Sequence, residues 1–175
     1  MAKKAVAKAK PVMIQLLYWN VRCLGDDWKQ ALILENLNSI NKNTDVTMLS
    51  ETKCKKKLDI LGKNAFQTEL SGQGGAVAIH TSSNAKIIKS LDQNVLWTTD
   101  IHDGALVNYV TLYIPPNSKE FAELSLRRLK WILYRIFLID KYSKVVVAGD
   151  FNRIGMKETK FLESHFHLTP VVDSG

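Results

Sequence analysis

The chain has 175 residues, of which 46% are hydrophobic and 23% are charged, and its formal net charge is +7. This length and composition fit one globular domain that can bury a core without disulfides or metals. The longest apolar run, residues 131–139, contains Arg135 and is too short to cross a bilayer, and no signal peptide is present, so we expect an intracellular protein without a membrane partner.

Residues 1–11 are rich in lysine and lack apolar periodicity, so we expect a disordered basic tail there and a folded domain over residues 12–175. The tail carries four of the positive charges, which leaves about +3 for the domain. A solvated leader and an arm that binds nucleic acid or directs the chain to the nucleus both fit this segment. We expect a nuclear protein. Cys23 and Cys54 are expected to be reduced thiols, because they form no CxxC pair and are too few for a zinc-finger site.

Apolar runs in the first half of the chain predict strands that alternate with one helix. The predicted elements are strands at residues 13–21, 45–51 and 76–80 and a helix at residues 28–41. Asp26 or Asp27 can cap the helix, and a glycine turn at residues 72–75 leads into the third strand.

The second half continues with strands and two helices. The predicted elements are strands at residues 86–91, 105–114 and 144–148 and helices at residues 121–142 and 159–166. The buried side of the longer helix is expected to carry Leu124, Leu129, Ile132, Leu133, Ile136 and Ile139. A hairpin-like middle, residues 72–114, interrupts the alternation of strands and helices, which predicts a layered α/β protein with a mixed sheet.

Polar side chains that can bind metal or phosphate follow four of the predicted strands. They are Asn20, Glu51, Tyr113, and the pair Asp150 and Asn152. Ligands bind at the carboxyl ends of strands in layered α/β proteins, because the loops diverge there. Each residue alone also fits a turn, a solvated strand end or a cap, but their joint placement predicts a site.

The residue types indicate phosphate chemistry. Glu51, with Asn20 and water, suits Mg²⁺, and Mn²⁺ is a possible substitute. Asp150 suits a general base or a group that orients water, whereas Asn20 and Asn152 suit donors to phosphate oxygens. Tyr113 can donate to the phosphate or to the leaving oxygen, while the metal polarises the phosphoryl group.

Five motifs resemble those of the endonuclease/exonuclease/phosphatase superfamily. In chain order they are WNVRCLG at residues 19–25, DVTMLSETK at 45–53, GQGGAVAIH at 72–80, LYIPPNS at 112–118 and VVVAGDFN at 145–152. Their order and approximate spacing agree with the family over nearly everything after Pro11. Within the family, NVRCLG, LSETK and YIPP are most similar to the endonuclease domains of LINE-type retrotransposons, which nick target DNA to prime reverse transcription.

The resemblance implies a four-layer α/β/β/α sandwich of the DNase I-like kind, with mixed sheets and with DNA as the partner. It also implies a role for each motif residue: Asn20 and Glu51 as the metal pair, Tyr113 as a catalytic phosphate contact, Asp150 as the catalytic acidic residue and Asn152 as the transition-state stabiliser.

The sequence departs from the family pattern after the GDFN motif. The family continues with further strands and an Asp-His pair, whereas this sequence ends at Gly175, directly after LTPVVDSG. We therefore expect a sandwich without its last strands that is marginally stable, aggregation-prone or completed by another polypeptide, such as a chain bearing a reverse transcriptase.

Three functions stay open at this point. The first is a Mg²⁺-dependent endonuclease of a retrotransposon that nicks DNA. The second is a catalytically inactive module that binds nucleic acid. The third is a phosphodiesterase of the same fold that acts on RNA, lipid or inositol phosphates.

A basic cluster follows the glutamate motif directly. It contains Lys53, Lys55, Lys56 and Lys57, and both a solvated loop and a contact with a phosphate backbone fit it. We expect Lys53, Lys55 and Lys56 to bind nucleic acid, together with Arg22 and Asn117 of two other motifs.

The histidines and tryptophans carry weaker signals. His80, His165 and His167 are interpreted as surface residues, although His80 ends a strand and also fits the wall of a groove. Trp19 and Trp131 are interpreted as core, while Trp28 and Trp97 fit either the core or stacking on a base.

Overall fold

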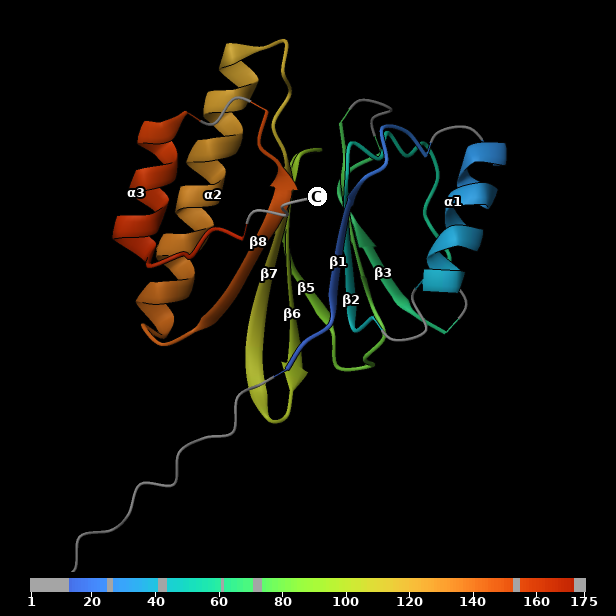
Figure 1. Cartoon of the computed structure of the whole chain (residues 1–175), viewed down its shortest axis with the longest axis horizontal. Coiled ribbons are helices and arrows are strands. Elements are labelled where there is room, and N and C mark those ends of the chain that lie inside the picture. The colour runs from blue at the N-terminus through green and yellow to red at the C-terminus, as the bar shows by residue number, and fades with distance from the viewer. Residues whose placement is uncertain are drawn as a thin grey trace, which may run out of the picture.

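The fold has four layers. The computed structural model describes residues 13–24, 27–40, 44–60, 62–70, 74–152 and 155–171. Two four-stranded sheets face each other, one helix covers the outer face of the first sheet, and two helices cover the outer face of the second (Figure 1). The predicted α/β/β/α sandwich with mixed sheets is therefore confirmed.

The first sheet is built from the N-terminal half of the chain. Its strands are β1 (Leu16–Asn20), β2 (Val46–Ser50), β3 (Asn64–Gln67) and β4 (Ala76–His80), in the order β1-β2-β4-β3. β1 and β2 are parallel, and β4 is antiparallel to both of its neighbours. Helix α1 (Asp27–Ile40) packs Leu34 and Leu37 onto a cluster that includes Leu49 and Val77. β2 and β4 are buried along their whole length, which is why they read as continuous apolar runs.

The second sheet is built from the C-terminal half. Its strands are β5 (Lys86–Leu91), β6 (Val95–His102), β7 (Ala105–Tyr113) and β8 (Lys144–Asp150), in that order. β5, β6 and β7 form an antiparallel meander, whereas β7 and β8 are parallel because helix α2 (Lys119–Ile139) connects them. Ser118 caps α2 by accepting a hydrogen bond from the backbone N–H of Phe121. Helix α3 (Met156–Phe166) packs beside α2.

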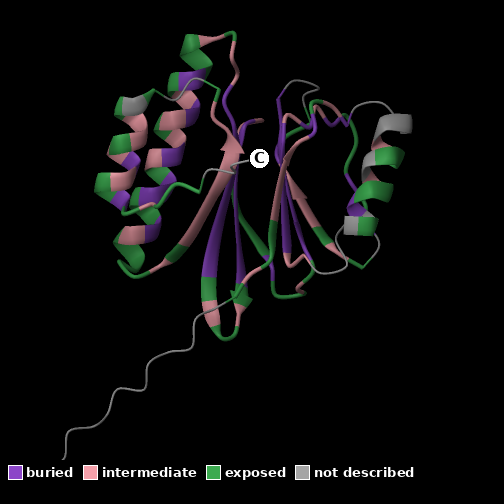
Figure 2. Cartoon of the chain, in the orientation of Figure 1, coloured by how far each residue is buried: buried purple, intermediate pink, exposed green. Residues whose placement is uncertain are grey.

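The two sheets bury their inner faces against each other. Figure 2 shows the buried residues concentrated in the facing strands. One inner cluster contains Met48, Val107 and Tyr109, and a second contains Ala78 and Leu96. This shared core fixes how the strand ends of one sheet lie relative to those of the other.

Gly149 in the GDFN motif is required by the packing of β8 on β7. A Cβ atom built at Gly149 would overlap the carbonyl oxygen of Leu112, its partner in β7, and would lie 2.8 Å from the Leu112 Cδ2 atom. Only glycine therefore fits directly before Asp150 in this strand.

Most predicted strands and helices are confirmed with ends shifted by up to three residues, but β3 and β6 were not predicted. β6 contains the polar run Thr98, Thr99 and Asp100, which resembles a loop in sequence. In the structure all three residues are buried. The basic segment at residues 1–11 lies outside the described residues. None of the described helices combines the length and the apolar character that crossing a membrane requires.

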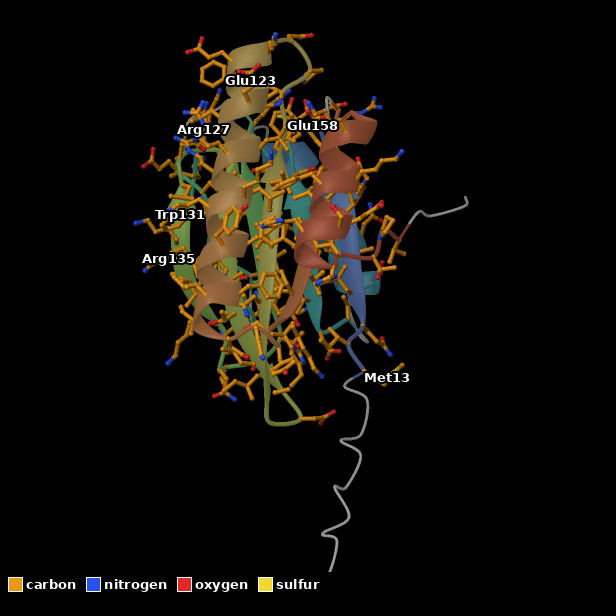
Figure 3. The ribbon with its side chains drawn as sticks, turned by 90° about the vertical axis from the view of Figure 1, so that its left-hand side faces the viewer. Met13, Glu123, Arg127, Trp131, Arg135 and Glu158 are labelled. Carbon is orange, nitrogen blue, oxygen red and sulfur yellow. The ribbon has the colours of Figure 1, made fainter. Side chains whose placement is uncertain are left out.

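The outer face of α2 corrects two expectations. Trp131 was expected in the core, but its exposed fraction is 43%, and Ile139 is also exposed. Figure 3 shows Trp131 on the flank of α2, in line with Arg127 and Arg135. Trp97, in contrast, is buried and donates its Nε1–H to Asn108 Oδ1 at 3.0 Å, so it is part of the core. Trp19 is half-buried against the cluster under α1, as expected for a core residue.

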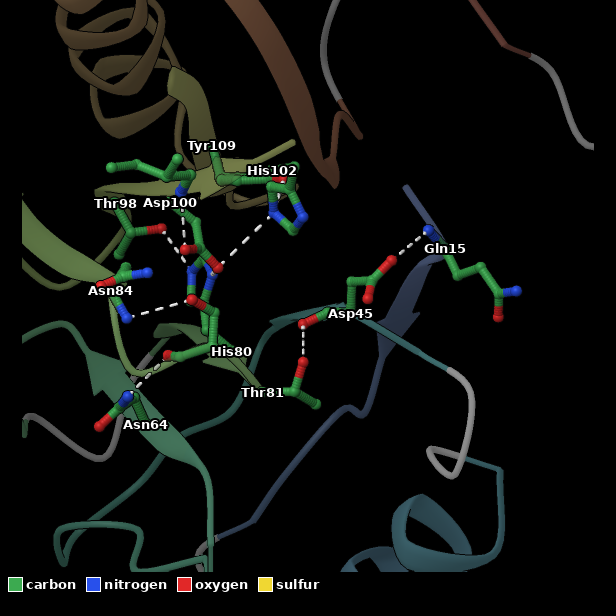
Figure 4. A network of polar contacts seen from close by, with 12 residues as sticks. Gln15, Asp45, Asn64, His80, Thr81, Asn84, Thr98, Asp100, His102 and Tyr109 are labelled. Atoms are coloured by element: carbon green, nitrogen blue, oxygen red, sulfur yellow. Dashed lines mark hydrogen bonds and ion pairs between the residues drawn. The ribbon is translucent and has the colours of Figure 1, made fainter. Parts of the chain in front are cut away.

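His80 corrects a third expectation, because it is fully buried between the sheets rather than on the surface. Its Nδ1 atom lies 3.3 Å from Asp100 Oδ2, and its Nε2 atom lies 3.0 Å from Thr98 Oγ1 (Figure 4). His102 extends the network, since its Nε2 atom lies 2.9 Å from the hydroxyl of Tyr109. These bonds satisfy the polar groups that made β6 look like a loop. His165 and His167 are exposed, as expected.

Candidate active site

The carboxyl ends of four strands meet at one end of the sandwich. Asn20 and Ser50 are paired at the ends of β1 and β2, and Tyr113 and Asp150 are paired at the ends of β7 and β8. In each sheet two parallel strands therefore end side by side, at the upper end of the molecule in Figure 1. The structure thus brings together residues from the first, second, fourth and fifth sequence motifs.

Asn20 and Asp150 connect the two sheets at this end. The Nδ2 atom of Asn20 donates a hydrogen bond to Asp150 Oδ2 at 2.5 Å, across 130 residues of sequence. The other oxygen, Asp150 Oδ1, accepts the backbone N–H of Asn152 at 3.2 Å. Asn20 Oδ1 accepts the backbone N–H of Arg22 at 3.0 Å, which fixes the orientation of the amide. The Asp150 carboxylate is therefore held in a defined position.

Glu51 directly follows β2 and sits on an unusual backbone. Its φ angle is +55°, and Arg22 and Lys53 also have positive φ angles, of 58° and 48°. Three non-glycine residues in the left-handed region within two adjacent loops are uncommon, and such positions cluster at functional sites. The ammonium group of Lys53 lies 2.9 Å from Glu51 Oε1, so a cation already occupies one side of this carboxylate.

Two tyrosines lie beside the carboxylates. Burial raises the pKa of Tyr113, and the negative charges of Glu51 and Asp150 raise it further. Burial also raises the pKa of Tyr18, whose hydroxyl lies 2.7 Å from Ser50 Oγ. Both phenols therefore stay protonated at neutral pH and can act as hydrogen-bond donors.

The remaining predicted site residues lie around this centre with fewer contacts. Asn152 is exposed, and its Nδ2 atom donates to the carbonyl of Ile114 at 3.3 Å, which holds it beside the end of β7. Arg22, Lys55 and Lys56 are exposed on the loops that follow β1 and β2. Asn117 is exposed in the turn before α2, and the structure shows no hydrogen bond between it and another described site residue.

The glycine motif packs tightly behind the site. A Cβ atom at Gly74 would overlap Asn94 Oδ1 and lie 3.2 Å from Tyr113 Cδ1, and one at Gly75 would overlap Thr52 Oγ1. The backbone N–H of Lys53 donates to the Gly74 carbonyl at 2.6 Å, so these glycines support the Glu51 loop.

Asn94 and Tyr18 are site-adjacent residues that sequence reasoning did not identify. Asn94 is buried, and its Oδ1 atom accepts no hydrogen bond from the described residues, although its backbone carbonyl accepts the N–H of Tyr113 at 2.9 Å. No sequence motif marks Asn94, because it lies in the turn between β5 and β6.

Two other features do not coincide with this centre. A groove of about 620 Å³ lies between the β3 and β5 edges and is lined by residues such as Lys57, Phe66 and Ile87, not by the strand-end residues. Within the described ranges, no three His, Cys, Asp or Glu side chains form a metal-binding group. Glu51 and Asp150 are the two carboxylates whose charges raise the pKa of Tyr113.

The chain is similar to known proteins in sequence and in fold. The sequence model of the "Endonuclease/Exonuclease/phosphatase family" matches residues 17–159. No curated protein matches the chain.

Solved structures share the fold. The catalytic domain of human Nocturnin with bound sulfate has a TM-score of 0.63 at 17% identity, over 86% of this chain and 69% of that one. The endonuclease domain of TRAS1, a telomere-specific non-LTR retrotransposon, has a TM-score of 0.58 at 14% identity, over 82% and 61%. An AP endonuclease from Archaeoglobus fulgidus has a TM-score of 0.59 at 15% identity, over 88% and 65%. The chain thus corresponds to roughly two thirds of each of these structures, with the same fold.

Proposed function

Because this chain belongs to the endonuclease/exonuclease/phosphatase family, we propose that it is a Mg²⁺-dependent phosphodiesterase that nicks DNA. Endonucleases, exonucleases and phosphatases all cleave phosphate esters, which supports hydrolysis of such an ester as the general activity. DNA, the metal and nicking are the specific parts of the proposal.

The contact between Asn20 and Asp150 carries the proposal. It joins the first and fifth motifs across the two sheets and holds the Asp150 carboxylate at the strand ends. Asp150 and Glu51 both lie close enough to Tyr113 to raise its pKa. A carboxylate, an amide and a phenol at one point supply the base, the donors and the metal ligand that phosphodiester hydrolysis needs.

The donor set fits Mg²⁺. This ion binds one or two carboxylates and keeps several waters, so a dense cluster of acidic residues is not required. Glu51 would be the main ligand, through the carboxylate oxygen that the Lys53 ammonium does not contact. Asn20 Oδ1 has a second lone pair besides the one used by Arg22 and would be the second ligand. When bound, the ion would polarise the phosphoryl group and stabilise the leaving oxygen.

The protein groups have separate roles in the proposal. Asp150 accepts a proton from the attacking water or orients that water, and Asn20 fixes the carboxylate for this task. Asn152 donates to a phosphate oxygen, since its amide group has a second N–H besides the one directed at Ile114. Tyr113 donates its phenol proton to a phosphate or leaving oxygen.

DNA is the proposed substrate for two reasons. Lys55 and Lys56 are exposed next to the Glu51 loop, where a phosphate backbone entering the site would contact them. The shared fold with the TRAS1 endonuclease domain also favours a retrotransposon endonuclease. The cell nucleus is then the proposed place of action.

A plasmid-nicking assay tests the proposal. The full chain should convert supercoiled plasmid to the open circle with Mg²⁺ and not with EDTA. Asp150→Ala should lower the rate by about 10²–10⁴-fold. Asp59→Ala, which removes an exposed carboxylate on the groove between β3 and β5, is the matched control and should nick like the parent.

The outcomes separate the alternatives. Nicking by Asp150→Ala at the parental rate would exclude the assigned role of Asp150. Salt-sensitive DNA binding without cleavage by the parent would identify a binding module instead. Faster cleavage of an RNA, a lipid phosphodiester or an inositol phosphate than of plasmid would exclude DNA as the preferred substrate.

A further inference from the structure

The outer face of α2 carries positive charge around an exposed aromatic ring. Arg127, Trp131 and Arg135 follow one another at four-residue intervals, and Figure 3 shows them along one side of the helix. Lys89 of β5 joins them, since its Nζ atom lies 5.9 Å from the centre of the Trp131 ring. We call these four residues the basic-aromatic face.

The proposed phosphodiesterase activity does not use this face. The face lies on the helix that covers the outside of the second sheet, whereas the candidate active site lies where the strands end. Packing does not require it either, because α2 buries a different set of side chains: Ala122, Ser125, Leu129, Ile132, Leu133 and Ile136.

The Trp131 ring is accessible although cations surround it. Its exposed fraction is 43%, and the Arg135 guanidinium carbon lies 5.8 Å from the ring centre. Both cations lie over the ring near the outer limit of a cation–π contact, and the ring stays partly exposed beside them. A tryptophan on a helix surface leaves apolar area in water, and a flat ligand would remove that area.

The nearby acidic groups have partners of their own. Glu123 lies 3.9 Å from Lys119, and Asp92 is paired with Arg128. Among the described residues, none of the cations Arg127, Arg135 and Lys89 forms an ion pair with an acidic side chain. The face therefore complements a polyanion rather than a cationic or neutral partner.

We propose that the basic-aromatic face binds single-stranded nucleic acid, separately from the active site. A base stacks on Trp131, and Arg127, Arg135 and Lys89 pair with the phosphates on either side. This combination of an aromatic platform and a basic track is how proteins bind single strands without reading their sequence. A duplex does not fit this mode, because its bases are stacked inside the helix.

Binding of labelled oligonucleotides tests the proposal. Fluorescence anisotropy with dT₁₂ and with U₁₂, in EDTA to prevent cleavage, compares DNA with RNA as the source of the strand. Trp131→Ala should weaken binding about tenfold, which is the range expected for loss of one stacked base. Trp131→Phe should keep most of the affinity, because a phenyl ring still stacks.

Charge variants and controls complete the test. The double variant Arg127→Glu/Arg135→Glu should make the negative slope of the log binding constant against log salt concentration shallower by about 1.4. Each phosphate contact on a single strand contributes about 0.7 to its magnitude. Lys160→Glu, an exposed charge on α3, is the matched control and should change the slope little. Circular dichroism of each variant checks that α2 is intact.

Two results would overturn the proposal. The first is parental affinity of Trp131→Ala and of the double arginine variant for both oligonucleotides. The second is a loss of self-association in light scattering without any change in oligonucleotide affinity, which would make the face a contact between copies of this chain. Absence of plasmid nicking by the parent would count against the proposed function. It would not bear on the binding of oligonucleotides by the basic-aromatic face, which is measured separately.

Discussion

Asn20 and Asp150 lie in different sheets, yet the Nδ2 atom of Asn20 is 2.5 Å from Asp150 Oδ2. No ladder of backbone hydrogen bonds joins β1 to β8. The distance between the two side chains therefore depends on how the inner faces of the sheets pack. The core thus positions the proposed catalytic carboxylate.

The first prediction concerns this contact. Asn20→Ala should lower the nicking rate by about 10²-fold, because it frees the Asp150 carboxylate to rotate and removes a proposed metal ligand. Raising the Mg²⁺ concentration should restore only part of the rate. Asn64→Ala is the control, since Asn64 is an exposed asparagine on β3, away from the strand ends, whose Nδ2 atom donates to the Ser82 carbonyl. Equal rates for Asn20→Ala and the parent would remove Asn20 from the site.

The second prediction concerns Gly149. Gly149→Ala should destabilise the protein by about 1–3 kcal/mol, because the new methyl group would overlap the Leu112 carbonyl and push β8 away from β7. Urea denaturation measures this loss. Gly155→Ala is the control, since its methyl group would meet only the flexible carboxylate of Glu158. A stable Gly149→Ala variant with full nicking activity would contradict the packing argument.

The third prediction concerns the phenol of Tyr113. Tyr113→Phe should reduce nicking about tenfold while leaving the thermal midpoint nearly unchanged, because the hydroxyl is proposed to donate to the phosphate and the ring stays in place. Burial and the charges of Glu51 and Asp150 raise the pKa of Tyr113, so its donor should persist above pH 10. Tyr142→Phe changes an exposed tyrosine after α2 and should have no effect.

The fourth prediction concerns pH and the buried His80. Burial lowers the pKa of His80 below its usual 6.5, and this outweighs the nearby Asp100 carboxylate, which raises it. The unfolded chain therefore binds a proton at a higher pH than the folded chain does. The free energy of unfolding should be constant above about pH 6.5 with respect to this group and should decrease as the pH falls from 6.5 towards the folded pKa.

Urea denaturation at pH 7.5 and 5.5 measures that decrease. His80→Gln should unfold more easily at both pH values, because it breaks the buried network, but it should lose less stability between them. The control is His167→Asn, an exposed position with a φ angle of 54° that asparagine tolerates. A parental pH dependence in His80→Gln would exclude His80 as its source.

The strand ends that carry the candidate site residues are visible in the sequence. Strands such as β2 and β8 are continuous apolar runs, and the polar residue that ends each run is visible in the sequence. What the sequence does not contain is the distance between strand ends in different sheets. Asn20 and Asp150 share no local spacing, so only the packed sandwich shows that they touch.

The unpredicted parts have one physical origin. β6 was missed because Thr98 and Asp100 read as polar loop residues, although His80 from the other sheet binds both of them. His80 was expected on the surface because its sequence neighbours do not show that Thr98 and Asp100 bond to it. A polar residue can be buried when a partner bonds to it, and the partners of His80, which are Thr98 and Asp100, are about 20 residues away in the sequence. Trp131 was placed in the core because hydrophobicity alone does not tell which side of α2 faces the sheets.

The buried network around His80 and the site around Asp150 lie at opposite ends of the sandwich, since His80 is paired with Val46 at the start of β2 and Glu51 follows its end. At one end the bond between His80 and Asp100 joins the sheets in the core. At the other end the bond between Asn20 and Asp150 joins them where the strands finish. A partly unfolded state in which both sheets persist but slide past each other would keep the circular dichroism of strands and helices. Such a state would have no working site, so loss of nicking would precede loss of secondary structure in rising denaturant.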